Sequence, residues 1–330
     1  MLLTAASDKA KPMAGVIEGD LASRALWSQA RGTTSRTLRI FLGDEVEGPL
    51  VWLMSVDPTE PAADGSDLEF RPAQAHYHRS PTFRVALGPQ PRQFKFDQNI
   101  YGQDDFIALD SNRFYQDPFS AGGGALLLVL ADRRGFQPTN RKLAGMSSDE
   151  IIAKYAAQYG DFGAAMAEVN LDDSNADLGI YASFGVTKAG RLRGSLRETS
   201  AWNALADGSR VSAIKLGTRP HAPLLIMSEN TPGVVESAPC LARTDMFRFI
   251  VSGSCRIGDR EYGPGSFIAV EAGRKIDAVV HGDAGSTQLL LVADGRNWRP
   301  ECSESAQCQR QDRIADIVRQ ATADRPSVTA

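Results

Sequence analysis

The stretch YGQDDFIALDSNR, residues 101–113, occurs a second time as YGPGSFIAVEAGR, residues 262–274. Three further segments return in the same order: GPLVWLMSVDP (48–58) as APLLIMSENTP (222–232), FRVALG (83–88) as FRFIVSG (247–253), and ALLLVLADRRGFQP (125–138) as LLLVADGRNWRP (289–300). Four colinear matches are hard to obtain by chance, because each must fall in the right order and at a similar offset. The sequence therefore predicts an internal duplication, with one unit used twice.

Each copy has the pattern of an all-β domain. Short runs of branched and aromatic residues, such as LVWLMSV and FIAL in the first copy and LLIMS and SFIAV in the second, are separated by Gly, Pro, Asp and Asn. Such runs at close intervals are typical of a sandwich or a closed barrel. Strands do not alternate with helices, which argues against a parallel, doubly wound sheet.

Helix is predicted only outside the two copies. Ser147 and Glu150 have the spacing of a capping box ahead of the run IIAKYAAQY. Apolar residues at helical spacing predict a last helix over residues 310–321. We therefore expect five segments: an N-terminal arm (1–35), a first β domain (36–140), a partly helical connector (141–208), a second β domain (209–300), and a C-terminal helix and tail (301–330).

Composition excludes several classes of function. The chain has 330 residues, and its 36 Lys plus Arg against 40 Asp plus Glu give a formal charge of -4 without a long basic run. This balance argues against nucleic acid as a partner. The longest apolar run, residues 125–131, is far shorter than the ~20 residues of a membrane span. We see no signal-peptide core at the start, so we expect a cytoplasmic protein that does not bind membranes.

The four cysteines do not suggest a disulfide framework in a chain of this length. Cys302 and Cys308 are close enough in sequence to pair across a short loop. We expect reduced thiols instead, as in a cytosolic protein.

The chain has only four histidines, and two of them stand close together. His76 and His78 are two residues apart, so on a strand both rings point to the same face. If that face is the interior of a barrel, two imidazoles converge as a metal ion requires. The alternative is a solvent-exposed strand or a loop. His221 and His281 lie in what we interpret as other loops, and we expect them to be ordinary surface or packing residues.

The segment AHYHRSPTFRVALG (75–88), followed by YGQDDFIALDSNRFY (101–115), resembles the two motifs of the cupin superfamily. Cupins are small double-sheet jelly rolls. Because the resemblance extends to both copies, it implies a bicupin. The fold class expected is then all-β, with two tandem double-stranded β-helix (cupin/jelly-roll) domains, a partly helical connector and a C-terminal helix.

The cupin resemblance also implies a metal site, from which this chain departs at two places. Where the family has its acidic ligand, the chain has residues 81–83 (PTF), and where the family has its last histidine, it has residues 114–116 (FYQ). Candidates for a third ligand are Glu69, Asp97, Asp104, Asp110 and Asp117. Asp117 lies nearest the expected position and shares strand parity with Tyr115. Two histidines and one carboxylate favour Fe(II), with Mn, Zn or Ni as alternatives.

The second copy lacks the histidine pair. The segment PCLART replaces AHYHRS, so Cys240 stands at the place of His76 and Ala242 at the place of His78. Lys275 and Ile276 fall where a last histidine would lie. We therefore expect the second copy to be structural.

A narrower resemblance concerns Arg84. The segment HRSPTFRVALG is similar to the first motif of gentisate and related ring-cleaving dioxygenases, in which an arginine follows the histidine pair. Arg84 falls at that arginine, and an inward guanidinium can clamp a substrate carboxylate. Arg248 occupies the same place in the copy without histidines, which favours a shared structural ion pair. The final histidine-rich signature of those dioxygenases is absent.

These observations lead to one main functional hypothesis and one alternative. The main hypothesis is a metal-dependent bicupin enzyme acting on a small organic acid or aromatic substrate in the N-terminal barrel. His76, His78 and Asp117 hold a divalent ion, Arg84 orients a carboxylate-bearing substrate, and Tyr115 donates or accepts a proton. Dioxygenase, isomerase and lyase chemistry all fit. The alternative is a non-catalytic bicupin that binds a small molecule or is structural. A homodimer is expected because exposed strand edges need covering.

Overall fold

The structure is a computed structural model of the chain, and it describes the chain in segments. The described residues are 11–12, 15–22, 27–29, 35–43, 48–56, 80–87, 94–96, 99–110, 124–132, 147, 149–150, 153, 157, 180–182, 191–198, 202–299 and 305–323.

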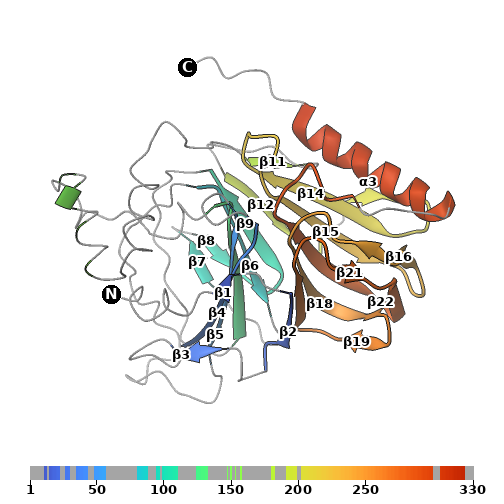
Figure 1. The fold of residues 1–330 in the computed structure, drawn as a ribbon, viewed down its shortest axis with the longest axis horizontal. Helices are drawn as coiled ribbons and strands as arrows, with labels where there is room; N and C mark the ends of the chain where they lie inside the picture. The colour runs from blue at the N-terminus through green and yellow to red at the C-terminus, as the bar shows by residue number, and fades with distance from the viewer. Residues whose placement is uncertain are drawn as a thin grey trace. The chain divides into compact units, whose positions relative to one another are not determined.

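The chain divides into two compact units, each built on an antiparallel sheet (Figure 1). The first unit contains Met1–Pro12, Ser23–Gly179 and Ala189–Leu196, and the second contains Met13–Ala22, Ile180–Lys188 and Arg197–Ala330. The two copies detected in the sequence therefore form the centres of the two units. Each unit, however, also takes a short segment from elsewhere in the chain.

The main sheet of the first unit is antiparallel except at one edge, where β1 and β4 pair in parallel. Its strand order is β1 (Lys11–Pro12), β4 (Ser35–Phe41), β5 (Leu50–Val56), β10 (Gly124–Leu130), β6 (Thr82–Leu87), β9 (Asp105–Leu109) and β12 (Arg191–Ser195), with β3 (Ser28–Gln29) paired to β4. A separate hairpin consists of β7 (Phe94–Phe96) and β8 (Asn99–Tyr101).

The second unit repeats this order. Its main sheet runs β11 (Ile180–Ala182), β14 (Arg210–Leu216), β15 (Leu224–Asn230), β22 (Val279–Val292), β18 (Met246–Ile257), β20 (Ser266–Val270) and β2 (Val16–Asp20). Three short strands pair beside this path: β13 (Asn203–Ala204), β16 (Val235–Ser237) and β19 (Arg260–Tyr262). A two-stranded sheet consists of β17 (Cys240–Leu241) and β21 (Lys275–Ile276).

The registers of the two sheets match residue by residue, which confirms the duplication. Arg84 of β6 lies opposite Leu128 of β10 and Ile107 of β9. Its counterpart Arg248 of β18 lies opposite Leu290 of β22 and Ile268 of β20. The prediction of two tandem all-β domains is therefore confirmed.

Helical structure agrees with the sequence at both predicted places. The last helix, α3 (Ser305–Ala323), includes the predicted range 310–321 and packs against β14 and β16. In the connector, the Glu150 amide donates to Ser147 Oγ at 3.3 Å and the Ser147 amide donates to the Glu150 carboxylate at 2.7 Å. This reciprocal pair is the predicted capping box. In the described part of the chain, no helix combines the length and apolarity needed to cross a membrane.

Each sheet is completed by a strand from the opposite half of the sequence. The N-terminal strand β2 pairs with β20 in the second unit, and β12 of the connector pairs with β9 in the first. Glu18 of β2 contacts two residues of the second unit. The Tyr262 hydroxyl donates a hydrogen bond to the Glu18 carboxylate at 2.6 Å, and Arg260 forms an ion pair with the same carboxylate. The boundaries expected from the sequence did not anticipate this exchange.

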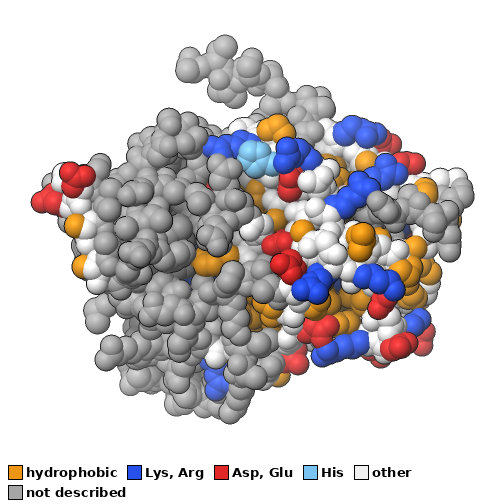
Figure 2. Space-filling view, viewed as in Figure 1, with side chains coloured by type: hydrophobic (Ala, Val, Ile, Leu, Met, Phe, Trp, Pro, Cys, Tyr) orange, Lys and Arg blue, Asp and Glu red, His pale blue; other side chains and the backbone are white. Residues whose placement is uncertain are grey.

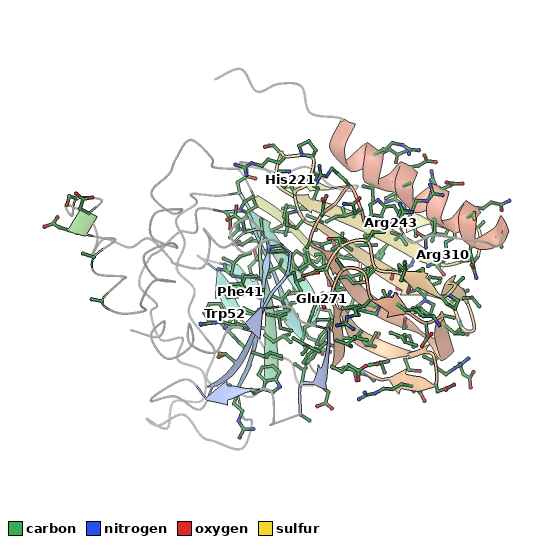
Figure 3. All side chains as sticks on the ribbon, viewed as in Figure 1. Phe41, Trp52, His221, Arg243, Glu271 and Arg310 are labelled. Carbon is green, nitrogen blue, oxygen red and sulfur yellow. The ribbon has the colours of Figure 1, made fainter. Side chains whose placement is uncertain are left out.

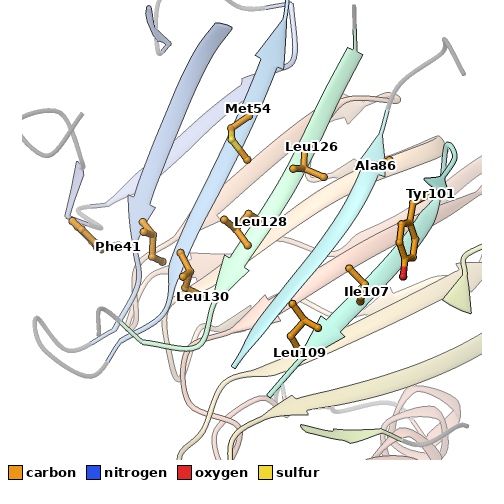
Figure 4. Packing of buried hydrophobic residues seen from close by; sticks show 10 residues of the cluster. Phe41, Met54, Ala86, Tyr101, Ile107, Leu109, Leu126, Leu128 and Leu130 are labelled. Carbon is orange, nitrogen blue, oxygen red and sulfur yellow. The ribbon is translucent and has the colours of Figure 1, made fainter. Parts of the chain in front are cut away.

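The first unit buries both faces of its sheet. All six residues of β6 are buried. One face carries a cluster that includes Leu126, Leu128 and Ile107 (Figure 4). On the other face Phe83 lies next to Phe106, with ring centroids 5.5 Å apart. The charged residue Arg84 therefore lies on a strand that is buried from solvent.

Gly194 of β12 provides a test of the strand exchange. It lies opposite Phe106, and a Cβ added at Gly194 would be 2.5 Å from the Phe106 ring. We expect Gly194→Ala to lower the free energy of unfolding by about 1–3 kcal/mol, because the ring must move within a packed core. Urea denaturation measures this change.

The control for that variant is Gly263→Ala, since nothing lies within 4 Å of a Cβ added at Gly263. We expect it to change the free energy of unfolding by less than about 0.5 kcal/mol. Equal stability of the two variants would contradict the packing of β12 against β9.

Candidate functional site

The predicted metal-site residues cannot all be located in the structure. His76, His78, Tyr115 and Asp117 lie outside the described residues, as do Glu69 and Asp97. Asp104 and Asp110 are described, and Asp104 is buried in a turn with φ of 66°. Among the residues that the structure describes, no group of three or more His, Cys, Asp or Glu could hold a metal.

Of the residues with an assigned role in the predicted site (His76, His78, Asp117, Arg84 and Tyr115), Arg84 is the one that the structure describes. Its exposed fraction is 1%, and its cross-strand neighbours Leu128 and Ile107 belong to the clustered face of the sheet. Directly opposed residues in a sheet point to the same face. Arg84 therefore shares the apolar face with this cluster.

Residues that lie directly opposite one another on neighbouring strands form a row across the sheet. The row that contains Arg84 also contains a second buried arginine. Arg39 of β4 lies opposite Trp52 of β5, and Trp52 lies opposite Leu128. The Arg39 guanidinium carbon is 3.8 Å from the Trp52 ring centroid, close enough for a cation–π contact. Arg39 and Trp52 were not among the predicted site residues (Figure 3 labels Trp52). The signal was an arginine inside the otherwise apolar run TLRIFL.

In the second unit the corresponding row has only one arginine, and its partner is identified. Arg248 donates through Nη1 and Nη2 to the two carboxylate oxygens of Glu236, each at 2.8 Å. Gln288 hydrogen-bonds to both residues. Ala213 and Ile226 occupy the places of Arg39 and Trp52. For Arg248, the structural ion pair expected from the sequence is confirmed.

His281 belongs to the same network, and our interpretation of it as a loop residue is wrong. It lies on β22 opposite Cys255 and has an exposed fraction of 2%. Its Nδ1 is 2.8 Å from Ser286 Oγ, and its Nε2 is 3.3 Å from the Glu236 carboxylate. The sequence did not show this because His281 sits in a run of alternating polar and small residues. His221 does lie in a turn, as expected.

The network determines the charge state of Glu236. Burial alone would raise the pKa of this carboxyl group. The charge of Arg248 and the hydrogen bonds from His281 and Arg248 outweigh that effect and hold the pKa well below its usual value. Glu236 is therefore ionised at neutral pH. Burial also raises the pKa of the neighbouring Cys255 thiol to about 11, which keeps it protonated.

The interior of the second unit contains a cavity of about 50 Å³. Cys240, Ala242 and Ile276 line it, together with Glu236 and Arg248. Cys240 and Ile276 lie directly opposite each other in the β17–β21 pair. Through the repeat, these positions correspond to His76, His78 and Tyr115. A single thiol with two apolar side chains does not fit a metal ion, which needs three or more donors.

The cysteines differ from expectation at one position. Cys240 and Cys255 are free, but Cys308 on α3 is disulfide-bonded. The expectation that all four thiols are reduced is therefore wrong for Cys308. Because disulfides persist mainly in oxidising compartments, the cytoplasmic location stays a prediction.

Comparison with known proteins identifies the fold. No family model matches the sequence, and no curated protein sequence matches it. Among solved structures, a protein from Nostoc punctiforme described as a "putative dioxygenase" is similar, with a TM-score of 0.51, 9% identity and coverage of 88% of both chains.

Two further structures cover a similar share of the chain. Oxalate decarboxylase from Bacillus subtilis has a TM-score of 0.44 and 13% identity over 87% of this chain and 79% of that one. The coconut allergen cocosin has a TM-score of 0.47 and 11% identity over 87% and 86%. Together with the duplicated sheets, the likeness to the Nostoc protein shows the fold of the chain: two tandem cupin-type β domains. At these identities the likeness concerns the fold alone.

The buried ion pair gives a pH-dependent prediction. We expect Glu236→Gln to lower the free energy of unfolding at pH 7 by about 3–5 kcal/mol, because Arg248 loses its counter-charge. The pKa of Glu236 is lower in the folded protein than its usual value of 4.5. The ionised carboxylate therefore stabilises the fold at pH values above 4.5, and this stabilisation is lost as the pH falls toward the folded-state pKa. The difference in the free energy of unfolding between the wild type and Glu236→Gln should therefore shrink below about pH 4.5. Urea denaturation from pH 3 to 7 measures it.

The matched control is the double variant Glu236→Gln/Arg248→Met. It removes both charges, so we expect it to be more stable than Glu236→Gln alone. A difference between wild type and Glu236→Gln that stays constant from pH 3 to 7 would contradict the assigned charge state.

Proposed function

We propose that the N-terminal barrel of this bicupin is a metal-dependent enzyme site that acts on a small organic acid or aromatic substrate. The observation that carries the proposal is the difference between the two units at matched positions. In the second unit, Cys240 and Ala242 line an interior cavity. Their counterparts in the first copy are His76 and His78, so the duplication supports an inward direction for both imidazoles.

The donor set of the first copy suits a divalent ion. His76 and His78 supply two nitrogen ligands, and Asp117 is proposed as the carboxylate. Two histidines and one carboxylate are the ligands of non-haem Fe(II) sites, with Mn, Zn or Ni as alternatives. When bound, such an ion supplies Lewis acidity and, in the case of iron, redox chemistry with dioxygen.

The chain's own residues orient the substrate and move its proton. Arg84 is proposed to hold a substrate carboxylate, which its buried position on the clustered face supports. Tyr115 corresponds to Ile276, which lies opposite Cys240, the counterpart of His76. This correspondence supports the proposal that Tyr115 is the group that donates or accepts a proton.

The row that contains Arg84 also supports the proposed substrate class. Arg39 and Trp52 add a second buried guanidinium and a large aromatic surface to the same face of the sheet. Guanidinium groups recognise carboxylates, and an indole ring packs against aromatic groups. These side chains favour an aromatic or otherwise planar carboxylic acid. Dioxygenase, isomerase and lyase chemistry all remain compatible with them.

Elemental analysis of the protein purified without added metal tests the proposal. We expect about one divalent ion per chain in the wild type and a loss of most of it in His76→Ala and in His78→Ala, because each variant removes one of few ligands. His221→Ala is the matched control, since His221 lies in a turn of the second unit. A metal-free wild type, or variants that keep their metal, would favour the non-catalytic bicupin.

A further inference from the structure

The cavity in the second unit has the size of a small-molecule site. Its apolar walls are formed by Ile226, Met246, Leu290, Trp298 and Ile314. Its volume of about 50 Å³ corresponds to the space of roughly four water molecules. Helix α3 contributes to the lining through Arg310, Gln311 and Ile314.

Cations outnumber anions among the residues that line this cavity. Four arginines line the cavity: Arg243, Arg248, Arg299 and Arg310 (Figure 3 labels Arg243 and Arg310). Glu236 is the single carboxylate in the lining. Elsewhere on the visible face of this unit, acidic and basic side chains are interspersed (Figure 2). Three of the four arginines are paired with carboxylates: Arg248 with Glu236, Arg299 with Asp312 and Arg310 with Asp207. Since guanidinium groups still outnumber carboxylates in the lining itself, the cavity favours an anion over a cation.

Two buried polar atoms of α3 mark where a ligand would be recognised. Arg310 has an exposed fraction of 7%, and its terminal nitrogens donate to Asp207 and Asn230, whereas its Nε has no partner within the described residues. Gln311 has an exposed fraction of 3%, and its Nε2 donates to the Glu236 carbonyl at 3.3 Å. Its Oε1 has no partner among the same residues. Unsatisfied buried polar atoms are costly and call for an explanation.

We propose that this cavity binds a small hydroxycarboxylate of about two to four carbons without a metal. One carboxylate oxygen accepts a hydrogen bond from Arg310 Nε. The hydroxyl group donates to Gln311 Oε1, which a plain carboxylate cannot satisfy. The short carbon chain packs against the apolar walls. This site is separate from the metal site proposed in the first unit and does not depend on it.

Calorimetric titration of the full chain with lactate tests the proposal. The His76→Ala/His78→Ala background removes the other proposed site. We expect one lactate per chain with a Kd of about 1 mM or tighter. Propionate, which has the same carbon chain without the hydroxyl, should bind about tenfold more weakly, because Gln311 Oε1 stays unsatisfied.

Gln311→Leu should abolish the preference for lactate over propionate. Gln309→Leu, at an exposed position of the same helix, is the matched control and should retain it. Ile314→Phe fills the cavity and should remove binding of both acids while α3 remains helical by circular dichroism. The two variants are independent, so a folding defect in one leaves the other decisive.

Three results would overturn the proposal. The first is no lactate binding up to about 10 mM, which would assign the cavity to water. The second is lactate binding that survives both Gln311→Leu and Ile314→Phe. The third is lactate binding to the wild type that is lost in the His76→Ala/His78→Ala background, because that would place the acid in the first unit.

Discussion

Each of the two main sheets carries an arginine on its clustered face, and the residues around that arginine must offset the cost of burying its charge. A guanidinium taken out of water destabilises the fold unless an anion and hydrogen-bond acceptors surround it. In the second unit Glu236 supplies the anion, and Gln288 and His281 complete the network. Glu236 and Arg248 of this network also line the small cavity of the second unit.

The first unit keeps the same arginine in a different setting. Arg84 has the same cross-strand neighbours as Arg248, but its row adds Arg39 and Trp52 where the second unit has Ala213 and Ile226. Charged groups are costly to bury unless they are paired, and buried charges cluster at functional sites. The two units thus differ in the charged and aromatic side chains that this row places on the clustered face of the sheet.

Much of the fold could be predicted from the sequence, because a duplicated β domain repeats its apolar runs and turns in order. The pairing of β2 and β12 with distant strands could not be predicted. The segments VIEGD and RLRGS show no clear alternation of apolar and polar residues, and their partner strands are distant in sequence. The Glu236–Arg248–His281 network was missed for the same reason: Gln288 and Glu236 are 52 residues apart. The histidine pair was visible because both residues lie within one strand-length segment.

The central claim is that a metal ion belongs to the first unit and none to the second. Anomalous diffraction from crystals of the purified protein, collected on both sides of the metal absorption edge, tests it most directly. The account predicts one anomalous peak, about 2.0–2.2 Å from a ring nitrogen of each of His76 and His78, and no peak in the cavity beside Cys240. A peak in the second unit, or none in metal-replete crystals, would contradict it.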